Sequence, residues 1–228
     1  WYKKSLLSIL LTPFAWLYNG LTFIRCKLIT PQKADVPIIC IGNIVSGGAG
    51  KTPVALALGA RLRSLGREVH FITRGYFGRL TGPIRVNPKK HTAYDVGDEP
   101  ILLAQCAPTW VSHDRVAGAA EAKLAGADII ILDDGFQNPK LAKDLSFVVI
   151  DVAQGFGNGR VHPAGPLREP PNRALDRANA VIFIVGSEPA SDFAITPDNL
   201  PQIQARLIPK PTQRSFSGER IVAFAGIG

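Results

Sequence analysis

The stretch that decides the fold is Gly42-Asn43-Ile44-Val45-Ser46-Gly47-Gly48-Ala49-Gly50-Lys51-Thr52-Pro53. An apolar run, residues 36–41, precedes it, and a run of helix-forming residues, 54–65, follows it. A glycine-rich turn between a strand and a helix directs backbone N–H groups and the positive end of the helix dipole at one anion. The stretch therefore predicts a phosphate-binding loop. In such a loop Lys51 reaches the outer phosphates, and the Thr52 hydroxyl binds Mg²⁺.

This loop departs from the usual pattern at one position. The usual loop has glycine five positions before the glycine of Gly-Lys-Thr, and Val45 stands there instead. The simpler interpretation is a glycine-rich turn without a ligand, but the position of Gly-Lys-Thr at a strand–helix junction favours nucleotide binding. The residues expected to contact the nucleotide form a compact variant of the loop: Gly47, Gly48, Ala49, Gly50, Lys51, Thr52 and Pro53.

The composition indicates a globular protein with an acidic partner. The 228 residues carry a net charge of +8, and 46% of them are hydrophobic, so the chain can bury a full core. A basic chain favours a nucleotide, an anionic lipid headgroup or nucleic acid, and the lack of interleaved aromatic and basic residues places nucleic acid last. Three scattered cysteines without a Cys-x-x-Cys pair suggest neither zinc nor disulfides and fit a reducing compartment.

Residues 1–30 differ from the rest of the chain. Lysines precede an uncharged, mostly apolar stretch, residues 5–24, and Arg25 and Lys27 follow it. No convincing cleavage site supports a signal peptide, and Pro13 with polar neighbours weakens a transmembrane span, although its length of about 20 residues is met. Over a span and over a plain packed helix, we favour a helix that lies in the membrane surface, with lysines and arginines on anionic lipid. Its rings at headgroup level would be Trp16, Tyr18 and Phe23.

Apolar runs alternate with helix-like segments along the remainder of the chain. The expected strands are residues 36–41, 68–73, 109–112, 128–132, 146–151, 180–185 and 220–225, with a short extended piece at 204–208. This alternation predicts an α/β fold with a mostly parallel, doubly wound sheet. The chain contains no methionine and ends directly after a strand-like run, so we expect that it is trimmed at both ends.

Polar residues gather where the expected strands end, which is the edge at which open α/β sheets bind ligands. The run 128–132 is followed by Asp133 and Asp134, the position of the magnesium-associated carboxylate of P-loop enzymes. A basic turn, residues 74–79, follows another strand, and the loop 155–171 contributes arginines that can reach phosphates. Near Pro100, Asp98 or Glu99 is expected to cap the following helix.

Several motifs, in this order, resemble those of the tetraacyldisaccharide 4′-kinase family, which acts in lipid A biosynthesis. They are the loop described above, Thr73-Arg74-Gly75-Tyr76, Gly97-Asp98-Glu99-Pro100, Asp114-Arg115-Val116, Asp133-Asp134-Gly135-Phe136-Gln137 and Pro163-Ala164-Gly165-Pro166-Leu167-Arg168-Glu169-Pro170. The resemblance implies transfer of phosphate from ATP, with Mg²⁺, to the 4′-hydroxyl of an acylated glucosamine disaccharide 1-phosphate at the cytoplasmic face of the inner membrane.

The same resemblance implies roles for individual residues. Asp98 stands at the position of the family's catalytic aspartate and would orient the sugar hydroxyl and accept its proton. Lys51 and Asp134 would join it in catalysis, and Thr52, Asp133 and Asp134 would hold the metal. The substrate-binding residues expected on this basis are Arg74, Gly75, Tyr76, Glu99, Arg115 and Arg168.

The resemblance also divides the chain into three expected parts. These are a membrane-surface helix (1–30), a P-loop kinase core (31–203), and a linker with the first strand of a C-terminal lobe (204–228). Family members continue past Gly226-Ile227-Gly228 and carry an Asp-His-His segment tied to catalysis, which is absent here. This chain alone is therefore expected to bind nucleotide and to have low activity.

Two other functions remain open at this point. A nucleotide-switched membrane-surface ATPase of the partitioning and targeting type would use the same loop, but such proteins place lysine before the paired glycines, where Ser46 stands here. A small-molecule kinase or ligase would be fully active without residues 1–24. We expect an acylated lipid and an anionic membrane as partners, with no nucleic acid and no obligate protein partner.

Overall fold

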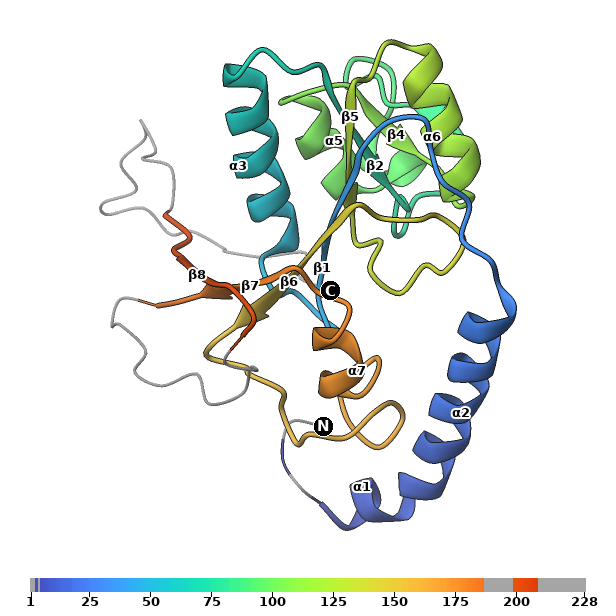
Figure 1. Ribbon diagram of the computed structural model, residues 1–228, viewed down its shortest axis with the longest axis vertical. Coiled ribbons are helices and arrows are strands. Elements are labelled where there is room, and N and C mark those ends of the chain that lie inside the picture. The colour runs from blue at the N-terminus through green and yellow to red at the C-terminus, as the bar shows by residue number, and fades with distance from the viewer. Residues whose placement is uncertain (1–2, 4, 187–198, 209–228) are drawn as a thin grey trace, which may run out of the picture.

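The computed structural model describes residues 3, 5–186 and 199–208. Within this part of the chain an eight-stranded sheet has the order β3-β4-β2-β5-β1-β6-β7-β8, and Figure 1 shows it at the centre of the molecule. The pairing of β3 with β4 is antiparallel, and the other pairings are parallel. The strands are β1 Ile38–Gly42, β2 Val69–Thr73, β3 Ile84–Arg85, β4 Thr109–Val111, β5 Ile129–Asp133, β6 Leu145–Asp151, β7 Ala180–Ile184 and β8 Gln202–Ala205. The mostly parallel sheet is thus confirmed.

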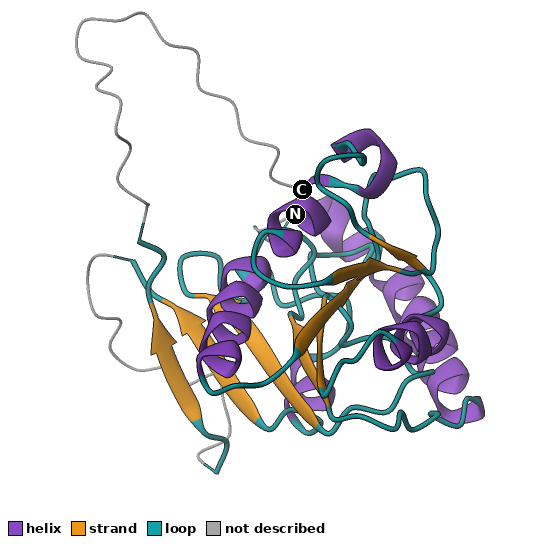
Figure 2. Ribbon diagram, turned by 90° about the horizontal axis from the view of Figure 1, so that it is seen from above, coloured by secondary structure: helices purple, strands orange, loops and turns teal. Residues whose placement is uncertain are grey.

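Helices cover both sides of the sheet, as seen from above in Figure 2. Successive residues of a strand point to opposite sides, and the two sides form separate cores. On one side Ile39 and Ile41 of β1 pack with residues of α3 (Lys51–Ser64) and α5 (Asp98–Ala104). On the other side Ile38 and Cys40 belong to the core that includes α6 (Arg115–Leu124) and α7 (Pro171–Leu175). The doubly wound arrangement follows from this alternation.

The hydrophobic N-terminal stretch forms two helices rather than one. Helix α1 spans Leu6–Leu10, and α2 spans Thr12–Leu28 with Pro13 in its first turn. Proline has no N–H to donate and is tolerated at that position, so the break falls at Leu11. In Figure 1 the two helices lie along one side of the molecule. Among the described residues, no helix combines the length and the apolar character needed to cross a membrane.

The C-terminal part of the core differs from the expected division. Strand β8 pairs in parallel with β7, so the boundary expected between residues 203 and 204 falls inside a strand of the core sheet. The strand expected at 220–225 lies outside the described residues. The sequence pattern did not predict β3 or the short helix α4, Ala93–Val96.

Candidate active site

The phosphate-binding loop leads directly into α3. Helix α3 begins at Lys51, three residues before the expected start, and both Lys51 and Thr52 are buried. Gly50 precedes the helix with φ +81, in the left-handed region, and a Cβ there would lie 3.2 Å from Ile184 Cγ1. A residue with a side chain would be strained at this position. The loop therefore needs glycine where the backbone turns into the helix.

Hydrogen bonds from Asn43 and contacts with the Gly- and Pro-rich loop hold the phosphate-binding loop in shape. The Asn43 side-chain amide donates to the carbonyl oxygens of Val45, at 2.6 Å, and Gly47, at 3.2 Å. Val45 is buried and forms an antiparallel bridge with Leu167. Next to it, the Arg168 N–H donates to the Ile44 carbonyl at 2.8 Å. The valine that replaces the usual glycine thus joins the phosphate-binding loop to the Gly- and Pro-rich loop.

Asp133 is the last residue of β5 and is fully buried. Its Oδ2 accepts a hydrogen bond from the Thr52 hydroxyl at 2.9 Å, whereas its Oδ1 has no hydrogen-bond partner. Burial, and next the negative charge of Glu99, raise the pKa of Asp133 to about 7. A buried carboxylate oxygen without a partner, beside a threonine hydroxyl, fits a site that a cation completes.

Asp134 is surrounded by positive charge. Arg168 binds it with both terminal nitrogens, at 2.7 and 3.2 Å, and Lys51 Nζ lies 3.9 Å from its Oδ1. Burial alone would raise the pKa of Asp134, but Lys51, Arg168 and Arg115 outweigh it, so the pKa is lowered. Its backbone has φ +57, an uncommon value for a residue with a side chain. Asp134 is therefore an ionised carboxylate held in a fixed position.

Helix α5 brings two more carboxylates to the same edge. Gly97, not Asp98 or Glu99, occupies the N-cap, and no side chain caps the helix, so the capping prediction is wrong. Asp98 is exposed, and its Oδ1 accepts from the Glu99 N–H at 3.0 Å. Glu99 is also exposed as a residue, but partial desolvation of its carboxyl group raises its pKa, and the charge of Lys51 opposes this shift. Glu99 thus lies within electrostatic reach of the metal-side residues, whereas the sequence assigned it to substrate.

A basic region lies at the ends of β2 and β4. Arg115 is buried, donates to the Ser112 carbonyl, and leaves its Nε without a partner. Burial lowers the pKa of Arg115, and the charge of Asp134 opposes the shift. Arg74 is exposed, and its charge acts on Arg115. The structure therefore brings the two arginines near one another and near Asp134.

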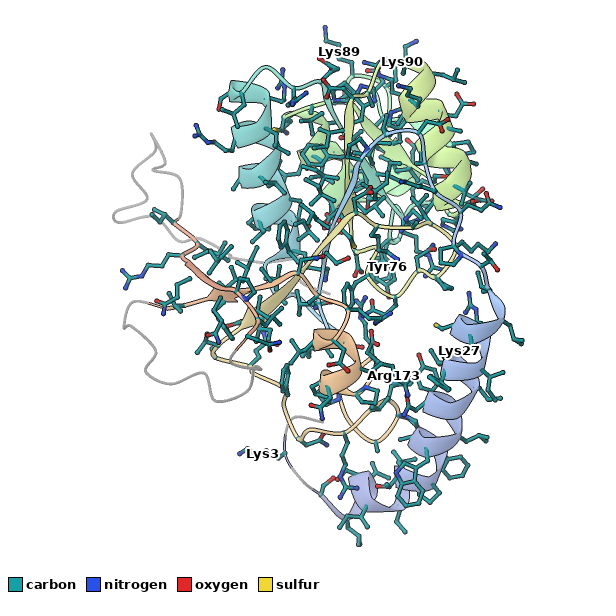
Figure 3. The ribbon with its side chains drawn as sticks, in the orientation of Figure 1. Lys3, Lys27, Tyr76, Lys89, Lys90 and Arg173 are labelled. Atoms are coloured by element: carbon teal, nitrogen blue, oxygen red, sulfur yellow. The ribbon has the colours of Figure 1, made fainter. Side chains whose placement is uncertain are left out.

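Gly75 and Tyr76 form a turn at the same sheet edge. Gly75 has φ +69, and a Cβ there would lie 2.8 Å from the Val96 carbonyl, so this position requires glycine. Tyr76 is 60% exposed and packs against the Phe77 ring with centroids 4.3 Å apart. Figure 3 labels Tyr76 below the strands, close to the ends from which the site is built.

Sequence reasoning assigned no role to Gln137, although the motif that contains it was recognised. The Gln137 amide donates to the Asn43 carbonyl at 2.8 Å and to Glu169 Oε1 at 3.2 Å, and its oxygen accepts from Arg168 at 3.2 Å. One side chain therefore connects the phosphate-binding loop with the arginine that holds Asp134. Its place three residues after Asp134, inside the recognised motif, was the signal available.

The fold and this site define a P-loop nucleotide-binding protein. Lys51 and Thr52 stand at the start of a helix, and the Thr52 hydroxyl donates a hydrogen bond to Asp133 at the end of a neighbouring strand. A family model described as tetraacyldisaccharide-1-P 4′-kinase, LpxK, matches residues 7–228. The chain belongs to this family of ATP-using phosphotransferases, which act on a hydroxyl group. The resemblance seen in the motifs is thereby confirmed.

Individual relatives agree with this family. The chain is 51% identical to a tetraacyldisaccharide 4′-kinase of Rhodospirillum centenum, covering all of this chain and 69% of the relative. It is 50% identical to that of Gluconobacter oxydans, covering 99% of this chain and 68% of the relative. The crystal structure of LpxK from Aquifex aeolicus in complex with ATP is similar, with TM-score 0.75 and 31% identity over 87% of this chain and 64% of that chain. The chain thus spans about two thirds of its relatives.

Proposed function

We propose that the protein transfers the γ-phosphoryl group of ATP to the 4′-hydroxyl of a tetraacylated glucosamine disaccharide 1-phosphate. One observation carries the proposal beyond family membership. Lys51, Thr52, Asp133 and Asp134 meet around the phosphate-binding loop, and the exposed Asp98 stands on the same side at the start of α5. A nucleotide site with an exposed carboxylate beside it suits transfer to an alcohol better than a switch that only binds nucleotide.

Phosphoryl transfer depends mostly on positioning and charge stabilisation. The loop N–H groups and Lys51 bind and neutralise the phosphates. Asp98 orients the acceptor hydroxyl and takes its proton. Because an ordinary aspartate is a weak base toward an alcohol, this proton moves late, and orientation is the larger contribution. Lys51 and Arg168 keep Asp134 ionised, and Arg168 also holds it in place.

Mg²⁺ fits the residues present. The unpartnered Asp133 Oδ1, the Thr52 hydroxyl and Asp134 would hold it. The described residues contain no group of three or more His, Cys, Asp or Glu side chains arranged for a metal, which suits Mg²⁺, because it takes one or two carboxylates together with phosphate oxygens and water. When bound, the ion supplies charge neutralisation at the phosphates.

We assign the anionic headgroup of the acceptor to the basic region at the ends of β2 and β4. Arg115 carries a buried guanidinium with an unused N–H, and Arg74 adds an exposed charge. Guanidinium groups bind phosphate through paired N–H donors. Tyr76, held by the Gly75 turn, offers an exposed ring at the same edge. We assign these residues to the disaccharide 1-phosphate, within a kinase core that begins at residue 31 and includes β8.

Helix α2 supports a position at the cytoplasmic face of the inner membrane. Its half-buried face carries small and polar side chains, whereas its exposed face is apolar, which is the reverse of a helix on a water-soluble core. The half-buried or buried residues are Thr12, Ala15, Asn19, Thr22 and Cys26. The exposed residues include Phe14, Trp16, Leu17, Leu21 and Ile24. With Arg25 and Lys27 for anionic headgroups, α2 would lie in the membrane surface.

The test uses the full-length gene product in detergent micelles with Mg-ATP and the acylated disaccharide 1-phosphate. Asp98→Asn should lower kcat by about 10²- to 10⁴-fold, as expected for loss of a general base, with ATP affinity within about two-fold of wild type. Thr52→Val should instead raise the KM for Mg-ATP, by about ten-fold, because it removes a metal-side oxygen. Labelled phosphate on the lipid and calorimetric ATP binding measure the two effects.

Two results would contradict the proposal. If the wild-type protein binds ATP but transfers no phosphate to the lipid, and nucleotide dimerises it, the switch ATPase is the better assignment. If Asp98→Asn and Thr52→Val lose ATP affinity equally, the division between acceptor-side and metal-side carboxylates is wrong.

A further inference from the structure

Helix α7 lies between the N-terminal helices and the active site (Figure 1). Its residue Arg173 faces α2: Nη1 donates to the Asn19 side-chain oxygen at 3.0 Å, and the guanidinium lies 4.6 Å from the centre of the Phe23 ring. Figure 3 shows Arg173 extending from α7 toward α2. A hydrogen bond and a cation–π contact from one side chain make this the main polar attachment of α7 to α2 among the described residues.

The turn after α7 faces the opposite way. Arg177 Nε donates to the Arg173 carbonyl at 3.3 Å, and Arg177 Nη2 donates to Glu169 Oε2 at 2.6 Å. The same guanidinium lies 4.8 Å from the centre of the Phe136 ring. Glu169 is only 6% exposed. A carboxylate buried to this extent depends on its charge partner, because removing the partner leaves an uncompensated charge.

Glu169 continues the path to the site. Its Oε1 accepts from Gln137, which in turn accepts from the Arg168 guanidinium that grips Asp134. The path therefore runs from α2 through Arg173, Arg177, Glu169 and Gln137 to the Arg168–Asp134 pair. The step from Arg173 to Arg177 is an exposed hydrogen bond to the Arg173 backbone carbonyl, so it depends on where α7 lies. The remaining steps to Asp134 are side-chain hydrogen bonds or ion pairs of 2.6 to 3.2 Å.

Helix α7 is well suited to transmit such a constraint. With five residues it is far too short to be stable by itself, so its placement depends on its contacts. Ala174 and Leu175 pack into the core, which fixes the helix against the sheet. Arg173 and Arg177 then determine how it is oriented between α2 and the site.

We propose that Arg173, Arg177 and Glu169 are positioning residues, through which the docking of α2 on α7 sets the orientation of Arg168 and Asp134 for Mg-ATP. The proposal deepens the proposed function and rests on it for the identity of the ligand. The N-terminal helices then have two separate roles on two faces. The apolar face of α2 meets lipid, and the face with Asn19 holds the metal side of the site in place.

The experiment measures calorimetric ATP binding to the full-length protein in detergent micelles, without lipid acceptor, in Mg²⁺ and in EDTA. The quantity of interest is the gain in ATP affinity that Mg²⁺ confers. Arg173→Gln should reduce this gain three- to ten-fold while leaving binding in EDTA within two-fold, and Arg173→Lys should restore part of it. Asn19→Ala removes the same hydrogen bond from the α2 side and should act in the same direction, which covers the case in which Arg173→Gln does not fold.

Arg160→Gln is the matched control. Arg160 also holds the N-terminal helices, through the Ser8 carbonyl at 2.8 Å and the Thr12 hydroxyl, whereas Glu169 is held by Arg177 and Gln137. It should leave the Mg²⁺ gain within two-fold of wild type. Because Glu169→Gln interrupts the same path, the double variant with Arg173→Gln should lose no more than the larger single variant.

Three results would overturn the proposal: an unchanged gain in Arg173→Gln and Asn19→Ala, an equal loss in Arg160→Gln, or additive losses in the double variant. Failure of the proposed function is distinguishable from these. If the proposed function fails, the wild-type protein transfers no phosphate to the lipid. The binding measurements contain no acceptor, so their outcome does not depend on that transfer.

Discussion

Strand β1 and helix α2 represent two opposite ways in which this chain uses apolar residues. All five residues of β1 are buried, and both its neighbours are parallel strands. In α2, which is 17 residues long, Ala15 is the one buried residue. The strand is specified by what surrounds it inside the protein. The helix places its largest apolar side chains outward. Contacts within the protein therefore do not explain its sequence, whereas contact with a membrane surface would.

The sharpest test of this contrast changes the outward face of α2. Leu17→Glu with Leu21→Glu places two charges where the side chains are 61% and 60% exposed. We expect binding to vesicles with anionic phospholipid to fall about 100-fold, because two leucines lose a transfer free energy of about 1.5 kcal/mol each. The melting temperature should change little, since neither residue is part of the core. Vesicle flotation and thermal unfolding measure the two quantities.

The control places the same two charges elsewhere. Leu65 and Leu124 are also exposed, at 60% and 82%, and they lie at the far ends of α3 and α6 from the site edge (Figure 1). Leu65→Glu with Leu124→Glu should leave vesicle binding within about two-fold. An equal loss in both double variants would mean that net charge alone drives binding, and the special role of α2 would be lost.

A second test compares one glycine in each region. A Cβ on Gly59 of α3 would lie 2.4 Å from Phe71 Cζ, whereas a Cβ on Gly20 of α2 would have no atom within 4 Å. Gly59→Ala should lower the free energy of unfolding by about 1–2 kcal/mol, since overpacking exceeds the gain in helix propensity. Gly20→Ala should leave it unchanged or raise it by up to about 1 kcal/mol. Urea unfolding measures both, and shifts of the same sign and size would contradict the contrast in packing.

Sequence patterns predicted the parts of the molecule that local residues determine. The strand before the loop, the helix start with Lys51 and Thr52, and the strand that ends in Asp133 all follow from short runs of consecutive residues. The positions of these elements at one edge also follow, because parallel strands connected by helices bring their carboxyl ends together.

The parts that pattern missed depend on contacts between distant segments. Gln137 and Glu169 meet only because the Gly- and Pro-rich loop bridges to Val45, and no local periodicity encodes that pairing. The break between α1 and α2 was visible as Pro13, but a proline in an apolar run marks a helix start or an end equally well. Strand β8 pairs with β7 at the edge of the core sheet. The spacing of apolar residues did not predict this pairing, because it gives no information on which strand lies at the edge.

The smallest expected effect concerns pH and again separates the two regions. His70 lies in β2 and is 1% exposed, and its Nδ1 accepts from Trp110 Nε1 at 3.2 Å. The indole is only a donor, so the ring proton is on Nε2, which lies 3.8 Å from Glu68 Oε1. Burial lowers the pKa of His70, with Glu68 opposing. The folded protein therefore holds this histidine neutral.

Because the folded pKa lies below the unfolded value of about 6.5, the unfolded chain binds more protons as pH falls. The stabilisation is fully present above pH 6.5 and decreases below it, with a slope of at most about 1.4 kcal/mol per pH unit. The free energy of unfolding of the wild type should therefore decrease between pH 7 and pH 5.5. His70→Gln should make this decrease smaller, by less than about 1 kcal/mol in urea unfolding. His113→Gln, at an exposed position, should have a smaller effect. In a His162→Gln background, which removes the ring that packs against Tyr18 of α2, vesicle binding should vary little over this range, because α2 itself contains no histidine. If vesicle binding weakened with pH in parallel with stability, the apolar face of α2 would depend on the core after all.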